Sequence, residues 1–255
     1  MKRIGTALVA GALLLAGCGG DGEQEGAAAQ PQRQTVTVLA AASLTDVFQE
    51  LEPAFERANP GADLRFNFAA SSDLASQIVA GAPADVFASA NEKQMQKVAG
   101  AGLLDGRAQL FATNTLTIAV PPGNPKGIEG FADLARPDVN EVVCAPQVPC
   151  GAATGEIEQA TGVALSPASE EPDVRSVLSK VASADADAGL VYVTDVATTS
   201  DVESVAFPEA GSAVNEYPIA VIAGAPAGTL GRAFVDFVRG DRGRQALQDA
   251  GFGPP

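Results

Sequence analysis

Two serines lie where predicted strands pass into predicted helices, and they are the side chains best placed to do chemistry. Ser43 follows the stretch 35–42, and Ser71 follows the stretch 62–70. The first turn of a helix carries free N–H groups and partial positive charge, and a serine there adds an O–H donor. This combination predicts an anion-binding site. The alternative is that each serine only caps its helix, Ser43 forming a capping box with Asp46.

The elements that would position these serines are two neighbouring strands. The stretch 35–42 is apolar, β-branched or small and carries no charge, which is typical of a strand buried on both faces in a parallel sheet. The stretch 62–69 alternates and predicts a second strand. Because the carboxyl ends of parallel strands meet at one edge of a sheet, we expect Ser43 and Ser71 to lie at the same edge.

Strands alternate with helices along the remaining chain, which predicts an α/β fold. The pattern contains about nine strands and nine helices, too many for a single sheet, so we expect two lobes. The stretches 115–120 and 217–222 are the expected crossing strands. The predicted first lobe comprises 35–114 and 223–255, and the predicted second lobe comprises 115–222.

The N-terminus is typical of an export signal. The apolar stretch 4–15 follows two basic residues and is too short to span a membrane. The sequence LAGC, which ends at Cys18, resembles a lipoprotein signal peptidase site and implies cleavage before Cys18 and lipid on that cysteine. We therefore expect a signal peptide at 1–17, a lipidated flexible tether at 18–34, and a protein anchored to the outer face of the cell membrane. The alternative is an ordinary signal peptide with a chance cysteine.

The formal net charge is −15, which argues against nucleic acid or anionic lipid surfaces as partners. Any anion site must therefore use locally aimed dipoles. A serine hydrolase using Ser43 or Ser71 is disfavoured, because the chain has no histidine to act as a base and no G-x-S-x-G motif. We predict that the protein is not an enzyme. A ligand-free adhesin or scaffold is a further alternative.

If Cys18 carries lipid, two cysteines remain, Cys144 and Cys150, in an oxidising compartment. They flank a short loop with two prolines, and we predict a disulfide between them; two buried thiols are the alternative. A site for a free metal cation is not expected, because the chain has no histidine and no other cysteine.

Several motifs occur in an order that resembles the periplasmic molybdate-binding proteins, the solute-binding subunits of molybdate ABC importers. The resemblance runs from Val36 to Phe252. It implies a two-lobed type II periplasmic-binding-protein fold with the ligand cleft between the lobes, no cofactor, an ABC permease in the membrane as partner, and a monomer. The motifs that carry it are AAASLTD (40–46), FAASSDLASQI (68–78), GAPADVFASA (81–90), VPCG (148–151), DVR (173–175) and GLVY (189–192).

The resemblance also implies a set of ligand-binding residues. It assigns hydroxyl donors from the first lobe, backbone N–H donors from two helix starts, and one tyrosine hydroxyl from the second lobe. Ser72, adjacent to Ser71, leaves open which of the two serines faces the ligand. Cys150 replaces the alanine expected at its position, which need not matter for a main-chain contact. The implied residues are Ser43, Ser71, Cys150, Val174 and Tyr192.

This set suits molybdate, a fully deprotonated tetrahedral dianion that only accepts hydrogen bonds. The absence of a carboxylate from the set disfavours hydrogen phosphate, whose proton needs an acceptor. Tungstate should bind as well, and sulfate or another small oxyanion is the alternative ligand. We expect Arg175 to pair with a nearby carboxylate, and Asp46, Asp73 and Asp195 to be acidic residues of helix first turns.

Overall fold

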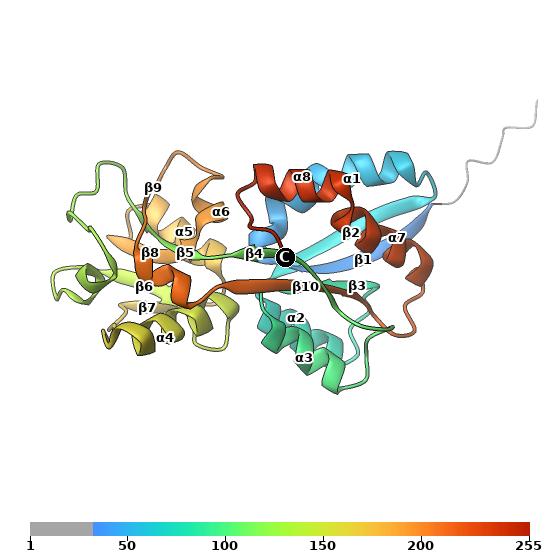
Figure 1. Ribbon diagram of the computed structural model, residues 1–255, viewed down its shortest axis with the longest axis horizontal. Helices are drawn as coiled ribbons and strands as arrows, with labels where there is room; N and C mark the ends of the chain where they lie inside the picture. Colours follow the sequence, from blue (N-terminus) through green and yellow to red (C-terminus); the bar gives the residue numbers. More distant parts are fainter. Residues whose placement is uncertain (1–32) are drawn as a thin grey trace, which may run out of the picture. The chain divides into compact units, whose positions relative to one another are not determined.

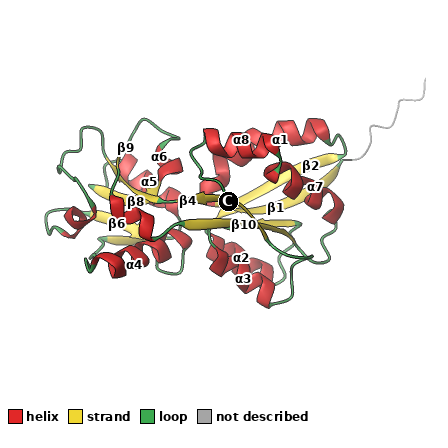
Figure 2. Ribbon diagram, viewed as in Figure 1, coloured by secondary structure: helices red, strands yellow, loops and turns green. Residues whose placement is uncertain are grey.

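The computed structural model describes residues 33–255. The predicted signal peptide and the lipidated Cys18 lie outside the described residues. The boundary predicted between residues 34 and 35 is too late, because Gln34 is already the first residue of the first strand. Residues 33–255 form two five-stranded mixed sheets, each covered by helices, which are the two lobes (Figures 1 and 2). None of the helices in this part of the chain is long and apolar enough to cross a membrane.

The first sheet has the order β2-β1-β3-β10-β4. Strand β1 is parallel to β2 and β3, and β10 is antiparallel to β3 and β4. The register pairs Ala41 with Ala69, so β1 and β2 end side by side, as predicted from the sequence. The bounds are β1 Gln34–Ala41, β2 Ala62–Ala69, β3 Val86–Ala88, β4 Gln109–Asn114 and β10 Asn215–Val221.

The second sheet has the order β7-β6-β8-β5-β9. Strand β6 is parallel to β7 and β8, whereas β5 is antiparallel to β8 and β9. Each of the three parallel strands is followed by a helix, so three helix N-termini lie at the carboxyl edge of this sheet. The bounds are β5 Leu116–Val120, β6 Glu141–Cys144, β7 Ser169–Glu171, β8 Ala188–Tyr192 and β9 Glu203–Val205.

The predicted range of 115–222 for the second lobe is wrong at its end. Strand β10 pairs between β3 and β4 in the first sheet, not with the second. Five of its seven residues are buried in succession, Tyr217 to Val221, which is the pattern of a strand covered on both faces. Its place inside the first sheet, with a strand on either side, explains why it is so apolar.

Helices cover both faces of the first sheet (Figure 1). The helices α1, α7 and α8 pack on one face and α2 and α3 on the other, and each face has its own buried apolar cluster. The bounds are η1 Ala42–Leu44, α1 Thr45–Ala58, α2 Ser71–Val79, α3 Glu92–Gly100, α7 Gly228–Arg239 and α8 Asp241–Asp249.

The second sheet is covered by α4 Pro149–Thr161, α5 Val174–Ala182 and α6 Val193–Val196, with the short 3-10 helices η2 Phe131–Ala135 and η3 Pro208–Ser212. Its core is mainly aliphatic. Val177, Val181 and Leu190 are typical of it, and Phe131 stacks on Phe207 with ring centroids 5.6 Å apart.

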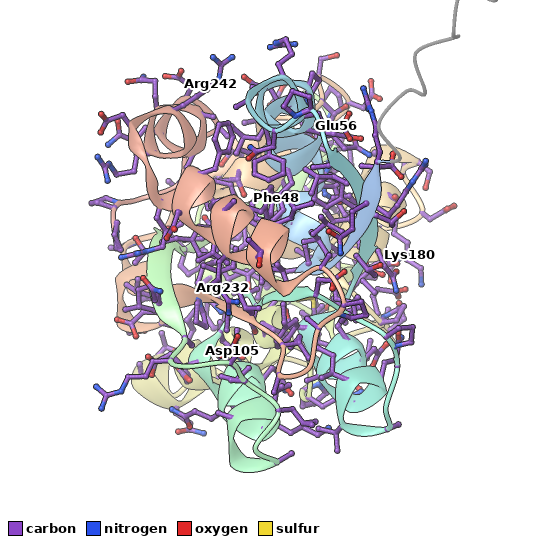
Figure 3. All side chains as sticks on the ribbon, turned by 90° about the vertical axis from the view of Figure 1, so that its right-hand side faces the viewer. Phe48, Glu56, Asp105, Lys180, Arg232 and Arg242 are labelled. Carbon is purple, nitrogen blue, oxygen red and sulfur yellow. A yellow bond between two sulfur atoms is a disulfide. The ribbon has the colours of Figure 1, made fainter. Side chains whose placement is uncertain are left out.

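Phe48 lies at the centre of the larger cluster of the first lobe (Figure 3). Its side chain is fully buried, and its ring contacts those of Phe66, Phe111 and Phe234 at centroid distances of 6.0, 6.1 and 5.5 Å. The ring of Phe234 meets it edge-on, a favourable geometry for aromatic pairs. Phe48 therefore ties α1 to β2, β4 and α7.

We expect Phe48→Ala to lower the free energy of unfolding by about 3–5 kcal/mol, because it leaves a cavity among three rings. Denaturant unfolding of the soluble domain measures this. Phe237→Ala is the matched control, since Phe237 is only partly buried at the edge of the same cluster, and it should cost clearly less. Equal losses for the two variants would contradict the central role of Phe48.

Candidate functional site

A small cavity lies between the lobes. Both sheets contribute to its walls through the helix starts at their carboxyl edges. All five residues that the sequence resemblance implied lie on these walls. The lining residues are Ala41, Ala42, Ser43, Ala69, Ala70, Ser71, Ala90, Val148, Pro149, Cys150, Asp173, Val174 and Tyr192.

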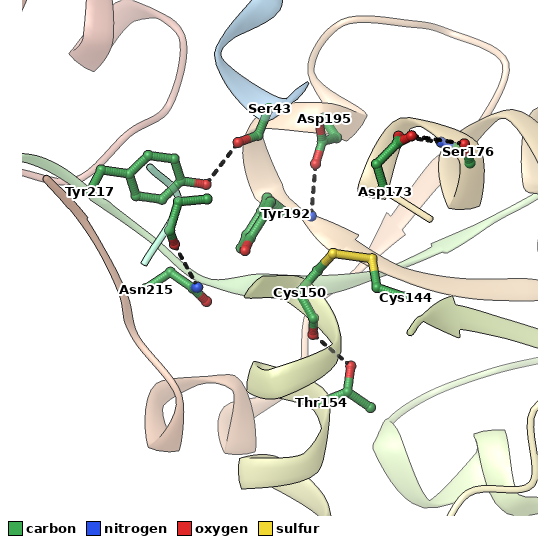
Figure 4. Close-up of a disulfide and its surroundings, with 11 residues drawn as sticks. Ser43, Cys144, Cys150, Thr154, Asp173, Ser176, Tyr192, Asp195, Asn215 and Tyr217 are labelled. Atoms are coloured by element: carbon green, nitrogen blue, oxygen red, sulfur yellow. Dashed lines mark hydrogen bonds between the residues drawn. A yellow bond between two sulfur atoms is a disulfide. The ribbon is translucent and has the colours of Figure 1, made fainter. Parts of the chain in front are cut away.

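The first-lobe wall presents two buried serine hydroxyls. Ser43 lies in η1, and its Oγ is 3.0 Å from the Tyr217 hydroxyl (Figure 4). Ser71 is the first residue of α2, and its Oγ accepts a hydrogen bond of 3.0 Å from the Ala90 N–H. Neither serine side chain caps a helix, so the capping alternative is wrong for both. Their hydroxyls are instead held by partners distant in sequence.

The two adjacent serines differ in their position relative to the cavity. Ser71 lines the cavity and is 1% exposed, whereas Ser72 is not among the lining residues. The Ser72 hydroxyl lies 3.5 Å from a carboxylate oxygen of Asp73. Successive residues at the start of a helix point in different directions, so only one of the pair can face the cavity.

The second-lobe wall is built from the first turns of α4 and α5. Helix α4 begins at Pro149, which places Cys150 in its first turn. Val174 is the first residue of α5, directly after the N-cap Asp173. First-turn N–H groups have no carbonyl partner within the helix and are available to a ligand. Both residues therefore offer main-chain donors on the cavity wall.

Cys144 and Cys150 form a disulfide, as predicted (Figure 4). The bridge connects the end of β6 to the first turn of α4. The following Gly151 packs against the backbone carbonyls of Cys144 and Ala145 so closely that a Cβ at this position would overlap them. The disulfide and the glycine together fix the start of α4, and with it the Cys150 N–H.

Tyr192 is the last residue of β8 and lines the cavity. Its side chain is 1% exposed, and its hydroxyl has no hydrogen-bond partner among the described residues. Its ring meets that of Tyr217 edge-on, with centroids 6.1 Å apart. Burial raises the pKa of the Tyr192 hydroxyl well above its ordinary value, so the group stays protonated. A buried hydroxyl without a partner is costly, and a ligand oxygen in the cavity would satisfy it.

The ion pair of Asp195 and Arg175 lies outside the cavity and contacts the Tyr192 backbone. Asp195 is fully buried, and one of its carboxylate oxygens accepts from the Tyr192 N–H at 3.0 Å. Its other oxygen lies 3.1 Å from Nε of Arg175, which also pairs with Asp46 of the first lobe. The prediction that Arg175 pairs with carboxylates is confirmed, and Arg175 is not on the cavity wall. Asp46, Asp73 and Asp195 all lie in helix first turns, as expected.

Desolvation raises the pKa of Asp195 to about 7, against the lowering effect of the Arg175 charge and the Tyr192 N–H. The nearby carboxylates of Asp46 and Asp173 raise it further. Asp195 therefore ionises near neutral pH within the folded protein.

The cavity wall carries no lysine or arginine, and its one carboxylate is that of Asp173. Both oxygens of that carboxylate are engaged, accepting from the Ser176 N–H at 3.0 Å and the Ser176 hydroxyl at 3.1 Å. Within residues 33–255, no cluster of three or more potential metal ligands is present. The wall therefore offers neutral O–H and N–H donors, which can hold a small acceptor-only anion.

Sequence reasoning did not assign a role to Tyr217 or to Asp173. Tyr217 lies in the stretch 217–222, the expected crossing strand, and its contact with Ser43 spans 174 residues. Asp173 is recognisable from sequence as an N-cap, because it precedes a helix by one residue. Its position on the cavity wall follows only from the fold.

Known proteins are similar to this chain at three levels: a family model, sequence relatives and solved structures. Residues 36–253 match the family described as "Bacterial extracellular solute-binding protein". The chain is 48% identical over 262 residues to the molybdate-binding protein ModA of Mycobacterium tuberculosis (strain ATCC 25618 / H37Rv), covering 100% of both chains.

Two solved structures are similar in fold. The periplasmic molybdate-binding protein of Azotobacter vinelandii matches with a TM-score of 0.74 and 20% identity, over 86% of this chain and 99% of that one. The sulfate-binding protein SubI of M. tuberculosis H37Rv matches with a TM-score of 0.77 and 20% identity, over 87% of each chain. The predicted α/β, two-lobed type II periplasmic-binding-protein fold is confirmed.

We expect Asp195→Asn to change how stability depends on pH. An acid whose pKa is raised from 3.8 to about 7 by folding favours the folded state at low pH and loses that contribution as pH rises through this range. The stability of the wild type relative to the variant should therefore fall between pH 4 and 7. Asparagine keeps an oxygen for the Tyr192 N–H. Denaturant unfolding of both proteins across this range measures the difference, and a constant difference would contradict the raised pKa.

Proposed function

The chain belongs to the family of bacterial extracellular solute-binding proteins, and we propose that within this family it is a molybdate-binding receptor of an ABC importer. The relatives are solute-binding transport proteins, and the chain is not an enzyme. The proposal also includes binding of tungstate, anchoring through a lipidated Cys18, and delivery of the anion to a membrane permease by a monomeric protein.

One observation carries the proposed ligand class. Ser43, Ser71, Cys150, Val174 and Tyr192 come from four helix starts and one strand end, and all lie on the wall of one small cavity. Their available groups are hydroxyls and main-chain N–H groups. A buried dianion needs several donors at once, since each charge-assisted hydrogen bond offsets part of its lost hydration. This set meets that requirement without a cation.

The same set favours a fully deprotonated anion over a protonated one. Hydrogen phosphate carries an O–H that must find an acceptor, and the Asp173 oxygens are already engaged with Ser176. A protonated anion would leave its own hydroxyl unpaired in a buried site, which costs about 1–3 kcal/mol. Sulfate is also a deprotonated dianion, and the donor set suits it equally, so sulfate is the second candidate ligand. The family resemblance and the 48% identity to a molybdate-binding protein favour molybdate.

We expect Ser43→Ala to weaken molybdate binding by about 1.5–3 kcal/mol, because it removes one donor to a charged ligand. Calorimetric titration of the soluble domain with molybdate, tungstate, sulfate and phosphate measures both affinity and selectivity. Ser72→Ala is the matched control, since Ser72 neighbours a site serine but does not line the cavity. It should bind as the wild type does.

Three outcomes would contradict the proposal or a part of it. Absence of binding to all four anions would reject the ligand class. Tight phosphate binding with weak molybdate binding would reject the donor-only account of the cavity. Equal loss in the Ser43 and Ser72 variants would remove Ser43 from the site.

The lipid anchor has a separate test. In a bacterial host that processes lipoproteins, the wild type should partition with membranes, and mass spectrometry should find a lipid on Cys18. Cys18→Ser should be released into the soluble fraction with unchanged molybdate affinity, because Cys18 precedes the folded domain. A wild-type protein without lipid on Cys18 would reject the anchor while leaving the binding proposal intact.

A further inference from the structure

One buried tyrosine next to the cavity has no part in the ligand set. Tyr217 lies in β10, is fully buried and does not line the cavity. Its hydroxyl lies 3.0 Å from Oγ of Ser43, and either oxygen could be the donor in this bond (Figure 4). Tyr217 therefore contacts Ser43, a residue of the ligand set, without reaching the cavity itself.

The second site serine is held in a comparable way. Oγ of Ser71 accepts a hydrogen bond from the Ala90 N–H at 3.0 Å. A main-chain N–H can only donate, so an acceptor position of the Ser71 hydroxyl is occupied and its proton is free for a ligand. The first-lobe wall thus contains two serines, and each serine hydroxyl is hydrogen-bonded to a buried residue that is distant in sequence.

We propose that Tyr217 is a positioning and specificity-determining residue, which donates its proton to Ser43 Oγ and so makes Ser43 present a proton, not a lone pair, to the anion. This inference rests on the proposed binding of a deprotonated oxyanion. It assigns to Tyr217 the role that the Ala90 N–H has for Ser71.

The direction of the bond follows from proton counting. A dianion in the cavity can only accept, so the Ser43 proton points to it, and the bond to Tyr217 must then use the tyrosine proton. Burial raises the pKa of the Tyr217 hydroxyl above its ordinary value, so the proton is always present. Tyr192, whose hydroxyl has no partner, is left to donate directly to the ligand.

The consequence is discrimination between deprotonated and protonated anions. A free serine hydroxyl can rotate and accept a proton from hydrogen phosphate. The Tyr217 proton occupies one acceptor position of the Ser43 oxygen, and the Ala90 N–H occupies one acceptor position of the Ser71 oxygen. Neither of these positions can then accept the proton of hydrogen phosphate. Removing the Tyr217 hydroxyl should therefore weaken molybdate binding and reduce the preference for molybdate over phosphate.

Tyr217→Phe is a suitable test because it leaves the ring in place. That ring packs edge-on against those of Phe111, Tyr192 and Phe252, at centroid distances of 6.2, 6.1 and 5.4 Å. These contacts do not need the hydroxyl, so the variant should fold. Circular dichroism and thermal unfolding check this before any binding experiment.

The experiment is a double-mutant cycle on the whole soluble domain, with molybdate and phosphate titrated by calorimetry at one slightly alkaline pH. Tyr217→Phe should weaken molybdate binding by about five- to tenfold, in keeping with the loss of one hydrogen bond. In the Ser43→Ala background the same change should have almost no further effect, because Tyr217 acts through Ser43. Tyr192→Phe is the control: Tyr192 lines the cavity itself, and the effect of losing its hydroxyl should persist in the Ser43→Ala background.

Three results would overturn the inference. Unchanged or tighter molybdate binding by Tyr217→Phe would show that Tyr217 does not orient Ser43 or competes for its proton. An undiminished effect in the Ser43→Ala background would show that Tyr217 acts by another route. An unchanged ratio of molybdate to phosphate affinity would remove its role in specificity. If the wild type does not bind molybdate, the proposed function itself fails, which is a separate outcome.

Discussion

The structure depends on the convergence of hydrogen-bond donors from both lobes on one small buried cavity. Helix first turns leave N–H groups without intrahelical partners, and burying such groups is unfavourable unless something accepts from them. The first turns of α2, α4 and α5, the 3-10 turn η1 and the end of β8 all meet here. Without a ligand, these buried donors lack acceptors and lower the stability of the fold. An acceptor-only anion would satisfy them, and this gain would favour binding.

Contacts across the cleft bring the two walls together. Arg175 of α5 pairs with Asp46 of α1, and the Asn114 amide donates to the Thr194 hydroxyl at 2.9 Å. The Gln94 side-chain amide donates to the Gln147 carbonyl at 3.0 Å, next to the start of α4. These contacts lie around the cavity and not inside it. The charges that help to close the cleft are thereby kept off the wall, where a cation would bind any anion indiscriminately.

In the second lobe, local contacts hold individual hydrogen-bond donors in place. The Cys144–Cys150 bridge closes a short loop, so its effect on global stability is small compared with one that closes a long loop. Its effect is to hold the first turn of α4, together with Gly151 packed on the Ala145 carbonyl. Asp195 does the same for β8 by accepting from the Tyr192 N–H, with Arg175 behind it. Cys144, Gly151 and Asp195 give this support without lining the cavity themselves.

The sequence by itself determined the features that depend on neighbouring residues. Strand 62–69, the strand-to-helix junctions at Ser43 and Ser71, and the short disulfide loop follow from local patterns of apolar, small and turn-forming residues. The tertiary structure decided what depends on residues far apart in the chain. It placed β10 in the first sheet, turned Ser71 and not Ser72 to the cavity, and set Tyr217 behind Ser43. These outcomes arise from packing between segments that no local pattern relates, because side-chain direction and burial are settled only when the sheets are assembled.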